Sequence, residues 1–372
     1  MIESDLSWLD KNNSLSCKLQ SMHQTLSKRF PKLDHISVAV YDPKTDYLRT
    51  FLDSSPHGPA LTHYQARLAD TPQLQKIRTT RKPTAIDDLS IYAGNNKEHT
   101  IRILQAGYRS SYTIPMIYED KFYGFVFFNS PQPALFAPAV VSHLDPFARL
   151  LAMLVICEMQ SIGKLKAATS TIRHITGRRD VETGSHLERM ARYSQLIAQE
   201  LTSDFNLSDE YIENLFLFAP LHDIGKITIP DRILLKPEHL SPDEYELMKT
   251  HPVKGLEIVD FMLSEFGLEQ LTHINILRNI VLYHHESLDG SGYPTGLAGD
   301  DIPLEAKIVT TADIFDALTS KRPYKPAWSN EKAFNTLLAM SNKKLDQHCV
   351  YALMAHQQKI AALQAQFQES LN

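Results

Sequence analysis

The chain has few cysteines and lacks a long apolar run. Its 372 residues include three cysteines, which lie far apart and are odd in number: Cys17, Cys157 and Cys349. They predict neither a disulfide framework nor a thiolate metal site, and they suit a reducing cytoplasm. The first residues are acidic where a signal peptide would be basic, and the most apolar run, residues 150–157, is far shorter than the roughly 20 residues that cross a bilayer. We therefore predict a cytoplasmic protein with no membrane partner.

The chain also lacks an excess of positive charge. It has 38 basic and 43 acidic residues, which leave a formal net charge of −5. A general nucleic-acid binder needs a broad basic surface, so we expect no DNA partner, whereas a small phosphate ligand needs only a local positive pocket. With 43% hydrophobic residues, a chain of 372 residues is long enough to form two ordinary domains.

Histidine is the residue type with an informative distribution. Two adjacent histidines, His284 and His285, run directly into a loop that contains Gly290, Gly292 and Pro294. Imidazole is the commonest neutral metal ligand near pH 7, and glycine and proline shape the backbone that follows it. Taken alone, the doublet also fits a polar helix end with two surface histidines.

Other candidate ligands precede and follow the doublet on what we expect to be consecutive helices of one domain. Asp313, for example, lies in an apolar helical stretch, where an unpaired carboxylate is costly to bury and a cation would remove that cost. One metal takes roughly four to six ligands, so the set fits two ions bridged by Asp223 and a third held by Glu182 and His186. Nitrogen and oxygen ligands without cysteine favour iron, manganese or zinc. The full set is Glu182, His186, His222, Asp223, His251, His284, His285 and Asp313.

The motifs around these residues resemble those of the HD-GYP domain, the branch of the HD hydrolase superfamily that hydrolyses cyclic di-GMP. They occur in the family's order and spacing over roughly residues 165 to 360. One stretch, residues 344–350, lacks the Phe and Pro that usually mark the start of the last helix, which puts the docking of that helix in doubt. The matching motifs are RDVETGSH at 179–186, HDIGK at 222–226, HP at 251–252, HHE at 284–286, DGSGYP at 289–294, ADIFDALT at 312–319 and RPY at 322–324.

The resemblance implies a two-metal centre held by His222, Asp223, His251, His284, His285 and Asp313, with Asp223 as the bridge. Glu182 and His186 would complete a third metal position, although Glu182 could instead only favour a helix N-terminus. The ions implied are two or three divalent metals, iron first and manganese as the alternative. Two ions roughly 3.5 to 4 Å apart can lower the pKa of a bridging water, so that hydroxide is available for attack on a phosphodiester.

The function implied is hydrolysis of cyclic di-GMP to linear pGpG, with GMP as a further product left open. One alternative is an HD hydrolase of another cyclic dinucleotide, such as cyclic GMP-AMP. Another is a non-catalytic receptor or scaffold. Retention of every ligand position weighs against the receptor, because a degenerate member would be expected to lose ligands.

Further residues are candidates for contact with substrate. Lys226, one turn after His222, is expected to contact substrate or the leaving group, although a lysine there also complements a helix C-terminus. Arg322 and Lys325 match the family's phosphate-binding residues, and Arg can bind phosphate with two parallel hydrogen bonds. Tyr293 could contact a guanine or only pack against its loop.

Three acidic residues are expected to support the site without binding metal. We interpret Glu286 and Asp289 as acceptors that fix the loop. Asp316 is expected to orient a metal ligand, which metal sites usually require.

The first half has alternating rather than helical patterns. Residues 35–41 and 48–52 predict one hairpin, residues 111–118 and 122–129 predict a second, and residues 136–158 predict a helix. This order resembles a GAF domain, an α+β fold with an antiparallel sheet and flanking helices. Such a domain would sense a small molecule or dimerise. Aromatic residues could line a ligand pocket, although we favour sheet core for them: Tyr112, Tyr118, Phe122, Tyr123, Phe125, Phe127 and Phe128.

A long helix is expected to connect the halves. We divide the chain into a GAF-like sensory domain (1–146), a connecting helix (147–178) and an all-α HD-superfamily phosphodiesterase domain (179–372). Apolar residues recur along the helix at steps of three to four, as in a seam between helices, so we favour a homodimer over a helix packed only on its own domains. The seam residues are Leu151, Leu154, Ile156, Met159, Ile162, Leu165 and Ile172.

Overall fold

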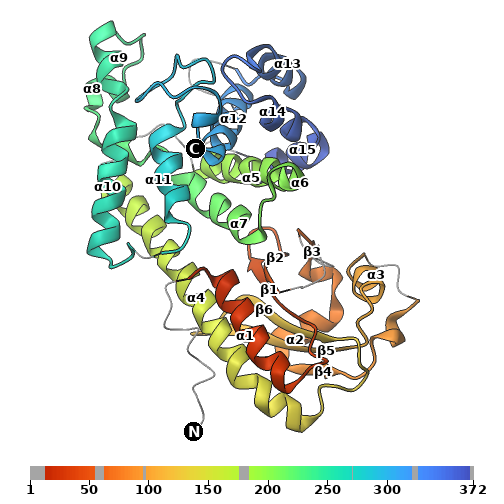
Figure 1. Ribbon diagram of the computed structural model, residues 1–372. Helices are drawn as coiled ribbons and strands as arrows, with labels where there is room; N and C mark the ends of the chain where they lie inside the picture. The colour runs from red at the N-terminus through yellow and green to blue at the C-terminus, as the bar shows by residue number, and fades with distance from the viewer. Residues whose placement is uncertain are drawn as a thin grey trace. The chain divides into compact units, whose positions relative to one another are not determined.

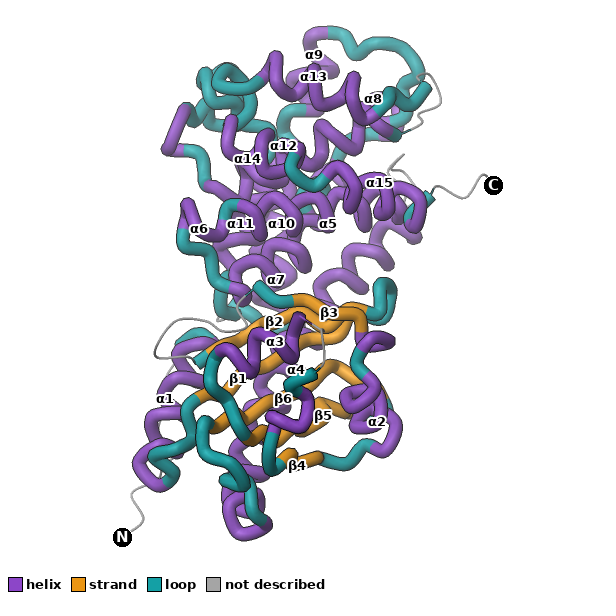
Figure 2. The backbone as a smooth tube through the Cα atoms, turned by 90° about the vertical axis from the view of Figure 1, so that its right-hand side faces the viewer, coloured by secondary structure: helices purple, strands orange, loops and turns teal. Residues whose placement is uncertain are grey.

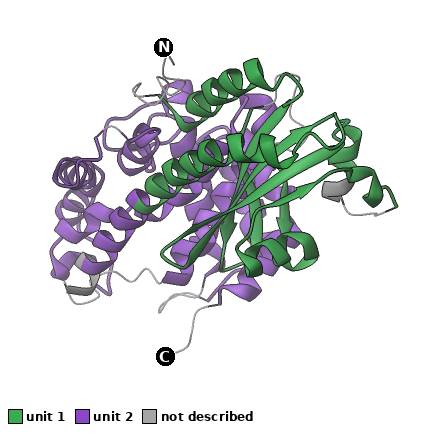
Figure 3. Cartoon of the chain, turned by 90° about the horizontal axis from the view of Figure 1, so that it is seen from below, with its two compact units in different colours: residues 1–160 green, residues 161–372 purple. Residues whose placement is uncertain are grey.

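A computed structural model describes residues 13–54, 63–94, 98–175, 184–269, 271–320 and 326–368. The chain divides into two compact units, residues 1–160 and residues 161–372 (Figure 3). The first is an α+β unit with an antiparallel sheet and the second is helical, which is the predicted fold class (Figure 2). The finer domain boundaries stay a prediction.

Unit 1 is built around one sheet of six antiparallel strands, in the order β3-β2-β1-β6-β5-β4 (Figure 1). Both expected hairpins are present: β1 (His35–Asp42) pairs with β2 (Tyr47–Asp53), and β5 (Ser110–Tyr118) pairs with β6 (Lys121–Ser130). β1 also pairs with β6, which joins the hairpins. The edge strands were not predicted, because three residues are too short to show an alternation: β3 (Gln65–Arg67) and β4 (Thr84–Ile86).

Alternate residues of the strands face two different layers. On one face, Ile36, Val38 and Ile114 lie in a core with α1 (Leu15–Arg29) and α4 (Pro138–Ile175). Residues between them, such as Ser37 and Thr113, face the opposite side, which short helices cover in part. The covering elements on that side are η2 (Leu68–Asp70), α2 (Pro72–Thr80), η3 (Leu89–Tyr92) and α3 (Glu98–Gln105).

α4 is one continuous helix that begins at Pro138, earlier than the expected connecting helix, and includes Pro146. The predicted seam residues are already buried within the single chain: Leu151 and Ile156 in the core of unit 1, Ile162 and Leu165 in the core of unit 2. The assignment of these four residues to a partner helix was therefore wrong, because apolar spacing indicates burial without indicating what covers it. Leu154 and Met159 pack partly against the same unit 1 core, and the side chain of Ile172 lies outside the described part. The homodimer itself stays a prediction.

The same helix contains an apolar segment that is much longer than the run at residues 150–157. Its segment Pro138–Thr171 is long and apolar enough to cross a membrane by length and composition, with a mean hydropathy of 1.6 in its most apolar window. The core helix of a globular protein passes this test too, and 33% of that window is buried here.

Unit 2 packs its helices around one large apolar core, which includes Tyr193, Phe218 and Phe315. The last helices dock well without the missing Phe and Pro. Asp346 caps α14 by accepting hydrogen bonds from the amides of His348 and Cys349. The elements are α5 (Gly184–Glu200), α6 (Thr202–Phe205), α7 (Asp209–Phe218), η4 (Ala219–Leu221), η5 (Ile224–Thr228), α8 (Asp231–Leu234), α9 (Pro242–Met248), α10 (His251–Glu265), α11 (Ile274–Tyr283), η6 (Gly299–Asp301), α12 (Leu304–Thr319), α13 (Asn330–Met340), α14 (Gln347–Met354) and α15 (Gln357–Gln366).

Candidate metal centre

His222 and Asp223 lie between η4 and η5, two short turns that follow α7. The next residue but one, Gly225, lets η5 contact α10. A Cβ at Gly225 would lie 1.9 Å from the carbonyl oxygen of His251 and 2.6 Å from the amide nitrogen of Gly255. Any larger residue would force these elements apart, so the glycine of the HDIGK motif brings His251 to Asp223.

Three histidines are held in the same tautomer. Nδ1 of His222, His251 and His284 each lies between 2.8 and 3.0 Å from a backbone carbonyl oxygen three or four residues earlier. A carbonyl oxygen only accepts, so Nδ1 carries the proton in each ring and Nε2 carries the lone pair. Metal-binding histidines are commonly oriented in this way.

The rings converge on one carboxylate. Nε2 of His251 and of His284 lie 3.0 and 3.5 Å from Oδ1 of Asp223. These three atoms are buried and make no hydrogen bond with any described residue. Lone pairs facing one another in a buried site are costly unless a cation lies between them. His285 adds a fourth ligand, and ligand atoms of all four residues lie within 4.8 Å of one another.

The protonation states suit a cation. Burial alone would raise the pKa of Asp223, but the Lys226 ammonium beside it holds that pKa well below its usual value. Lys226 Nζ lies 2.5 Å and His222 Nε2 3.1 Å from Asp223 Oδ2. Burial lowers the pKa of His284, and burial together with His284 lowers the pKa of His285 further. The site therefore offers an anionic carboxylate and neutral imidazoles, as metal binding requires.

A second group of ligand atoms consists of His186 on α5, His222, and Asp313 on α12, again within 4.8 Å of one another. His186 Nε2 lies 3.6 Å from Asp313 Oδ1. His186 was expected beside Glu182 at a third metal position, and it is grouped here with two residues expected in the two-metal centre. Glu182 lies outside the described residues.

Asp316 fixes the orientation of His186. Its Oδ2 accepts a hydrogen bond from His186 Nδ1 at 2.7 Å, and its carboxylate accepts two more from Arg189, at 2.7 and 2.9 Å. Burial opposes ionisation of this fully buried group, but His186 and Arg189 hold the pKa of Asp316 below its usual value. Sequence reasoning missed Arg189. Its signal is spacing: Arg189 follows His186, and Asp316 follows Asp313, by three residues, which is one helical turn.

The loop after the doublet is fixed by the acids that we expected to fix it. Glu286 Oε1 accepts hydrogen bonds from the amide and hydroxyl of Thr295 and from the amide of Gly296. Asp289 accepts from the amide and hydroxyl of Ser291. A Cβ at Gly292 would lie 2.4 Å from the amide nitrogen of Ser287, so this close fold of the loop requires glycine.

Tyr293 lies beside the centre. Its ring centroid is 4.7 Å from that of His285 and 6.2 Å from that of His251. Burial raises the pKa of Tyr293, so it stays protonated at neutral pH. The short distance to the His285 ring supports a packing role for Tyr293. A contact between Tyr293 and a guanine base stays a prediction. Arg322 and Lys325 lie outside the described residues.

Comparison with known proteins agrees with this geometry. Residues 181–349 match the family model described as the HD domain. The cyclic di-GMP phosphodiesterase response regulator RpfG of Xanthomonas campestris is 44% identical over 189 residues, which are 51% of this chain and 47% of that protein. The 3'3'-cGAMP-specific phosphodiesterase 2 of Vibrio cholerae is 37% identical over 187 residues, which are 50% of this chain and 34% of that protein.

For unit 1, a GAF domain from an Acinetobacter phosphoenolpyruvate-protein phosphotransferase is 19% identical with a TM-score of 0.33. The match covers 44% of this chain and 99% of that one, and the score is too low to assign the fold. The chain spans about half the length of the first curated relative and a third of the second. The matched residues include every described candidate ligand, so residues 181–349 of this chain are an HD domain.

Proposed function

We propose that this chain is a metal-dependent phosphodiesterase that opens cyclic di-GMP to linear pGpG at the histidine–aspartate cluster of its HD domain. The observation that carries the proposal is the convergence of His251 and His284 on Asp223, with buried nitrogen and oxygen atoms that make no hydrogen bond with described residues. A relative that is named a cyclic di-GMP phosphodiesterase supports the choice of substrate.

The donor set fits two divalent ions, with a third held by Glu182 and His186. Nitrogen and oxygen donors without thiolate favour iron, with manganese as the alternative. Ions bound there would supply Lewis acidity and a water of lowered pKa, the two effects that speed phosphodiester hydrolysis at neutral pH. Asp223 is proposed as the bridging carboxylate, because both of its oxygens face histidine nitrogens.

Lys226 is proposed to contact the scissile phosphate or the leaving group. Its ammonium lies beside Asp223, and its side chain is 21% exposed, so it remains accessible to a ligand in the site. Arg322 and Lys325 are proposed to bind the other phosphate, since a cyclic dinucleotide carries two and guanidinium can pair with phosphate in a bidentate manner. Tyr293 is proposed as a wall of the same site.

For unit 1 we propose a GAF-like sensory domain that adjusts the rate of hydrolysis, in a cytoplasmic homodimer without DNA or membrane partners. The antiparallel sheet order and the helices on its two faces support this assignment. We retain 1–146, 147–178 and 179–372 as the proposed functional divisions.

The test is anaerobic purification of the 372-residue chain, metal analysis, and hydrolysis of cyclic di-GMP, 3'3'-cGAMP, cyclic di-AMP and linear pGpG. We expect cyclic di-GMP to be cleaved fastest. A preference for 3'3'-cGAMP would support the alternative that the Vibrio relative favours. A metal-loaded chain that binds cyclic di-GMP and cleaves none of the panel would be a receptor, and the proposal would fail.

The third ion has a separate test. Glu182→Ala is expected to lower the metal content by about one ion and to leave the other two. Glu246→Ala, a change on exposed α9, serves as the matched control. Unchanged metal content in Glu182→Ala would refute the third site.

A further inference from the structure

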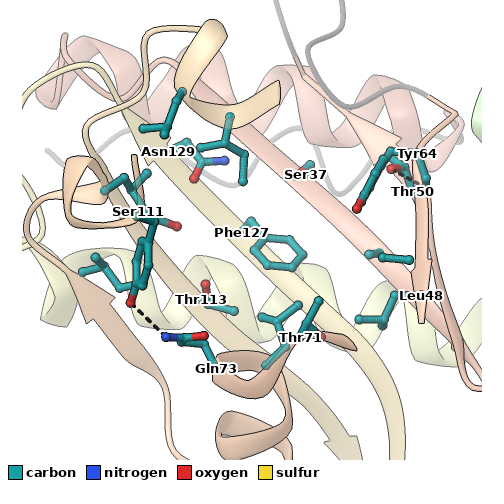
Figure 4. A pocket seen from close by; sticks show the side chains of 18 of the residues that line it. Ser37, Leu48, Thr50, Tyr64, Thr71, Gln73, Ser111, Thr113, Phe127 and Asn129 are labelled. Atoms are coloured by element: carbon teal, nitrogen blue, oxygen red, sulfur yellow. Dashed lines mark hydrogen bonds between the residues drawn. The ribbon is translucent and has the colours of Figure 1, made fainter. Parts of the chain in front are cut away.

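Unit 1 contains a cavity of about 250 Å³ between the sheet and the elements that cover its second face (Figure 4). The sheet side is formed by β1, β2, β5 and β6, and the cover by residues such as Leu74 of α2 and Leu104 of α3. In Figure 4 the Phe127 ring lies in the middle, with Asn129 and Ser111 towards one end and Leu48 and Tyr64 towards the other. Of the aromatic residues for which we favoured sheet core over a pocket, Tyr112, Tyr123 and Phe128 lie in the core, whereas Phe127 lines this cavity.

Strand register brings polar residues together on this face. Ser37 of β1 and Thr113 of β5 both stand opposite Phe127 of β6, so the three form one row across the sheet. Ser111 stands opposite Asn129 in the next row. These polar positions alternate along the strands with Ile36, Tyr112 and Phe128, whose side chains lie in the apolar core on the other face. A sheet that buried this face only against its own helices would carry apolar residues here too.

Three hydroxyl groups on this wall have no hydrogen-bond partner among the described residues: those of Ser37, Ser111 and Thr113. The residues are 3%, 7% and 4% exposed, so bulk water does not surround them. Their hydroxyl oxygens remain accessible from the cavity, where they can hydrogen-bond a molecule bound against this wall. A bound molecule in the cavity would supply those partners.

Asn129 adds an acceptor of fixed orientation. His35 Nε2 lies 2.8 Å from Asp53 Oδ2, and a carboxylate only accepts, so Nε2 carries the proton of the neutral ring. Nδ1 of His35 therefore accepts, and the group 2.9 Å from it is the amide Nδ2 of Asn129. With Nδ2 held in this way, Oδ1 of Asn129 is the side-chain atom left to accept a hydrogen bond from a ligand.

The remaining wall limits the chemistry of that ligand. The twenty described lining residues include no acidic or basic side chain, no histidine and no cysteine. A charged ligand would be buried without a counter-charge, which is costly. A thioether-linked chromophore would have no thiol to which it could attach. The lining is mostly apolar and includes Leu48, Leu74 and Ile103.

We propose that this cavity binds an uncharged, mostly apolar small molecule that donates a hydrogen bond to Asn129 and meets the hydroxyls of Ser37, Ser111 and Thr113. The ligand class is thus distinct from the anionic dinucleotide proposed for the HD domain. The proposal does not depend on that function, and its test measures binding alone.

The test uses three matched probes with the 372-residue chain, followed by saturation-transfer NMR titration. Indole is neutral and has one N–H donor, 1-methylindole lacks the donor, and indole-3-carboxylate carries a charge. We expect saturable binding of indole, about three- to tenfold weaker binding of 1-methylindole, and at least tenfold weaker binding of the carboxylate. Cyclic GMP, as an anionic nucleotide, is expected not to bind in unit 1.

Two variants locate the binding. Ser111→Ala removes one hydroxyl with little change of shape and is expected to weaken indole binding about threefold. Ala66→Phe is expected to fill the cavity and abolish binding. Ser142→Ala, an exposed change on α4, is the control and should bind as the parent does. Absence of saturable indole binding, tighter binding of the anionic probes, or binding unchanged in both cavity variants would each overturn the proposal.

Discussion

The histidine cluster of unit 2 and the cavity of unit 1 both bury polar groups, but they hold them differently. In the cluster, each of three imidazoles has one nitrogen tethered to a backbone carbonyl, which aims the other nitrogen at a defined point. A negative carboxylate, Asp223, lies at that point with Lys226 beside it. In the cavity, hydroxyls such as those of Ser37 and Thr113 have no described partner, and no charge lines the wall.

This difference bears on what each region can bind. A metal requires several donors fixed at short distances, so a metal site depends on tethers that orient every ligand. A neutral organic molecule supplies its own shape and hydrogen-bonding groups, so rotatable hydroxyls on an apolar wall are sufficient. The first region is therefore expected to lose function abruptly when one group is changed, and the second gradually.

The largest expected effect follows removal of the shared carboxylate. Asp223→Ala should release metal and reduce hydrolysis of cyclic di-GMP to the detection limit. His251 and His284 then lose the carboxylate beside them, and the Lys226 ammonium has no anion next to it, so its positive charge repels a metal ion. Metal analysis by mass spectrometry and a turnover assay measure this. Asp260→Ala, at an exposed position of α10, is the matched control. Full metal content with retained turnover would refute the bridging role.

A backbone contact should matter nearly as much as a ligand. Gly225→Ala places a methyl group 1.9 Å from the His251 carbonyl oxygen, so η5 and α10 must separate. We expect the free energy of unfolding to fall by about 1–3 kcal/mol and metal retention to fall with it. Urea denaturation and metal analysis test both effects.

Gly163→Ala is the matched control for this change. A Cβ there meets nothing within 4 Å, and the residue lies inside α4, so alanine should raise the free energy of unfolding by about 0.5–1 kcal/mol. If both substitutions had the same effect, the close approach at Gly225 would not be what positions His251.

The two regions also differ in how far the sequence predicted them. Metal ligands are chemically rare residues at fixed spacing, so the doublet at His284 and the motif at His222 could be recognised without a structure. The tautomer of each ring could not, because it depends on a carbonyl oxygen placed by helix geometry. Arg189 was missed because a buried arginine at helical spacing looks like an ordinary surface residue until its partner, Asp316, is found on another helix.

The cavity was harder to predict because its residues are common in strands. Ser111 and Thr113 alternate with Tyr112 and Ile114 in a pattern that predicts a half-exposed strand, with the hydroxyls towards water. Burial of that face depends on α2 and α3, which the pattern did not reveal. Aromatic residues are a poor guide to this cavity, because Tyr112, Tyr123 and Phe128 lie in the core on the opposite face of the sheet.

A smaller effect is expected from a residue that orients a metal ligand but is not expected to bind metal itself. Asp316→Asn keeps the shape of the side chain but weakens the hydrogen bond that orients His186 and the pair with Arg189. We expect metal affinity at the group of His186, His222 and Asp313 to fall by about 10- to 100-fold. The group of Asp223, His251, His284 and His285 should still bind metal. Metal titration followed by mass spectrometry measures this, with Asp300→Asn on exposed η6 as the control. Loss of all metal would mean that the two groups are not separable, and unchanged affinity would remove the orienting role.

Tyr293 shares one property with the cavity, since its hydroxyl makes no hydrogen bond with any described residue although its ring packs 4.7 Å from that of His285. Tyr293→Phe keeps that packing and removes the hydroxyl. If the ring only supports the loop, kcat and KM for cyclic di-GMP should both stay within about threefold of the parent values, because a neutral hydrogen bond contributes roughly 0.5–1.5 kcal/mol. A rise in KM of about tenfold, with kcat unchanged and metal content intact, would show that the hydroxyl contacts substrate. The Tyr293 hydroxyl would then resemble the hydroxyls that line the cavity of unit 1, because it would bind an organic ligand by a hydrogen bond. The histidines and the aspartate beside it would instead bind metal.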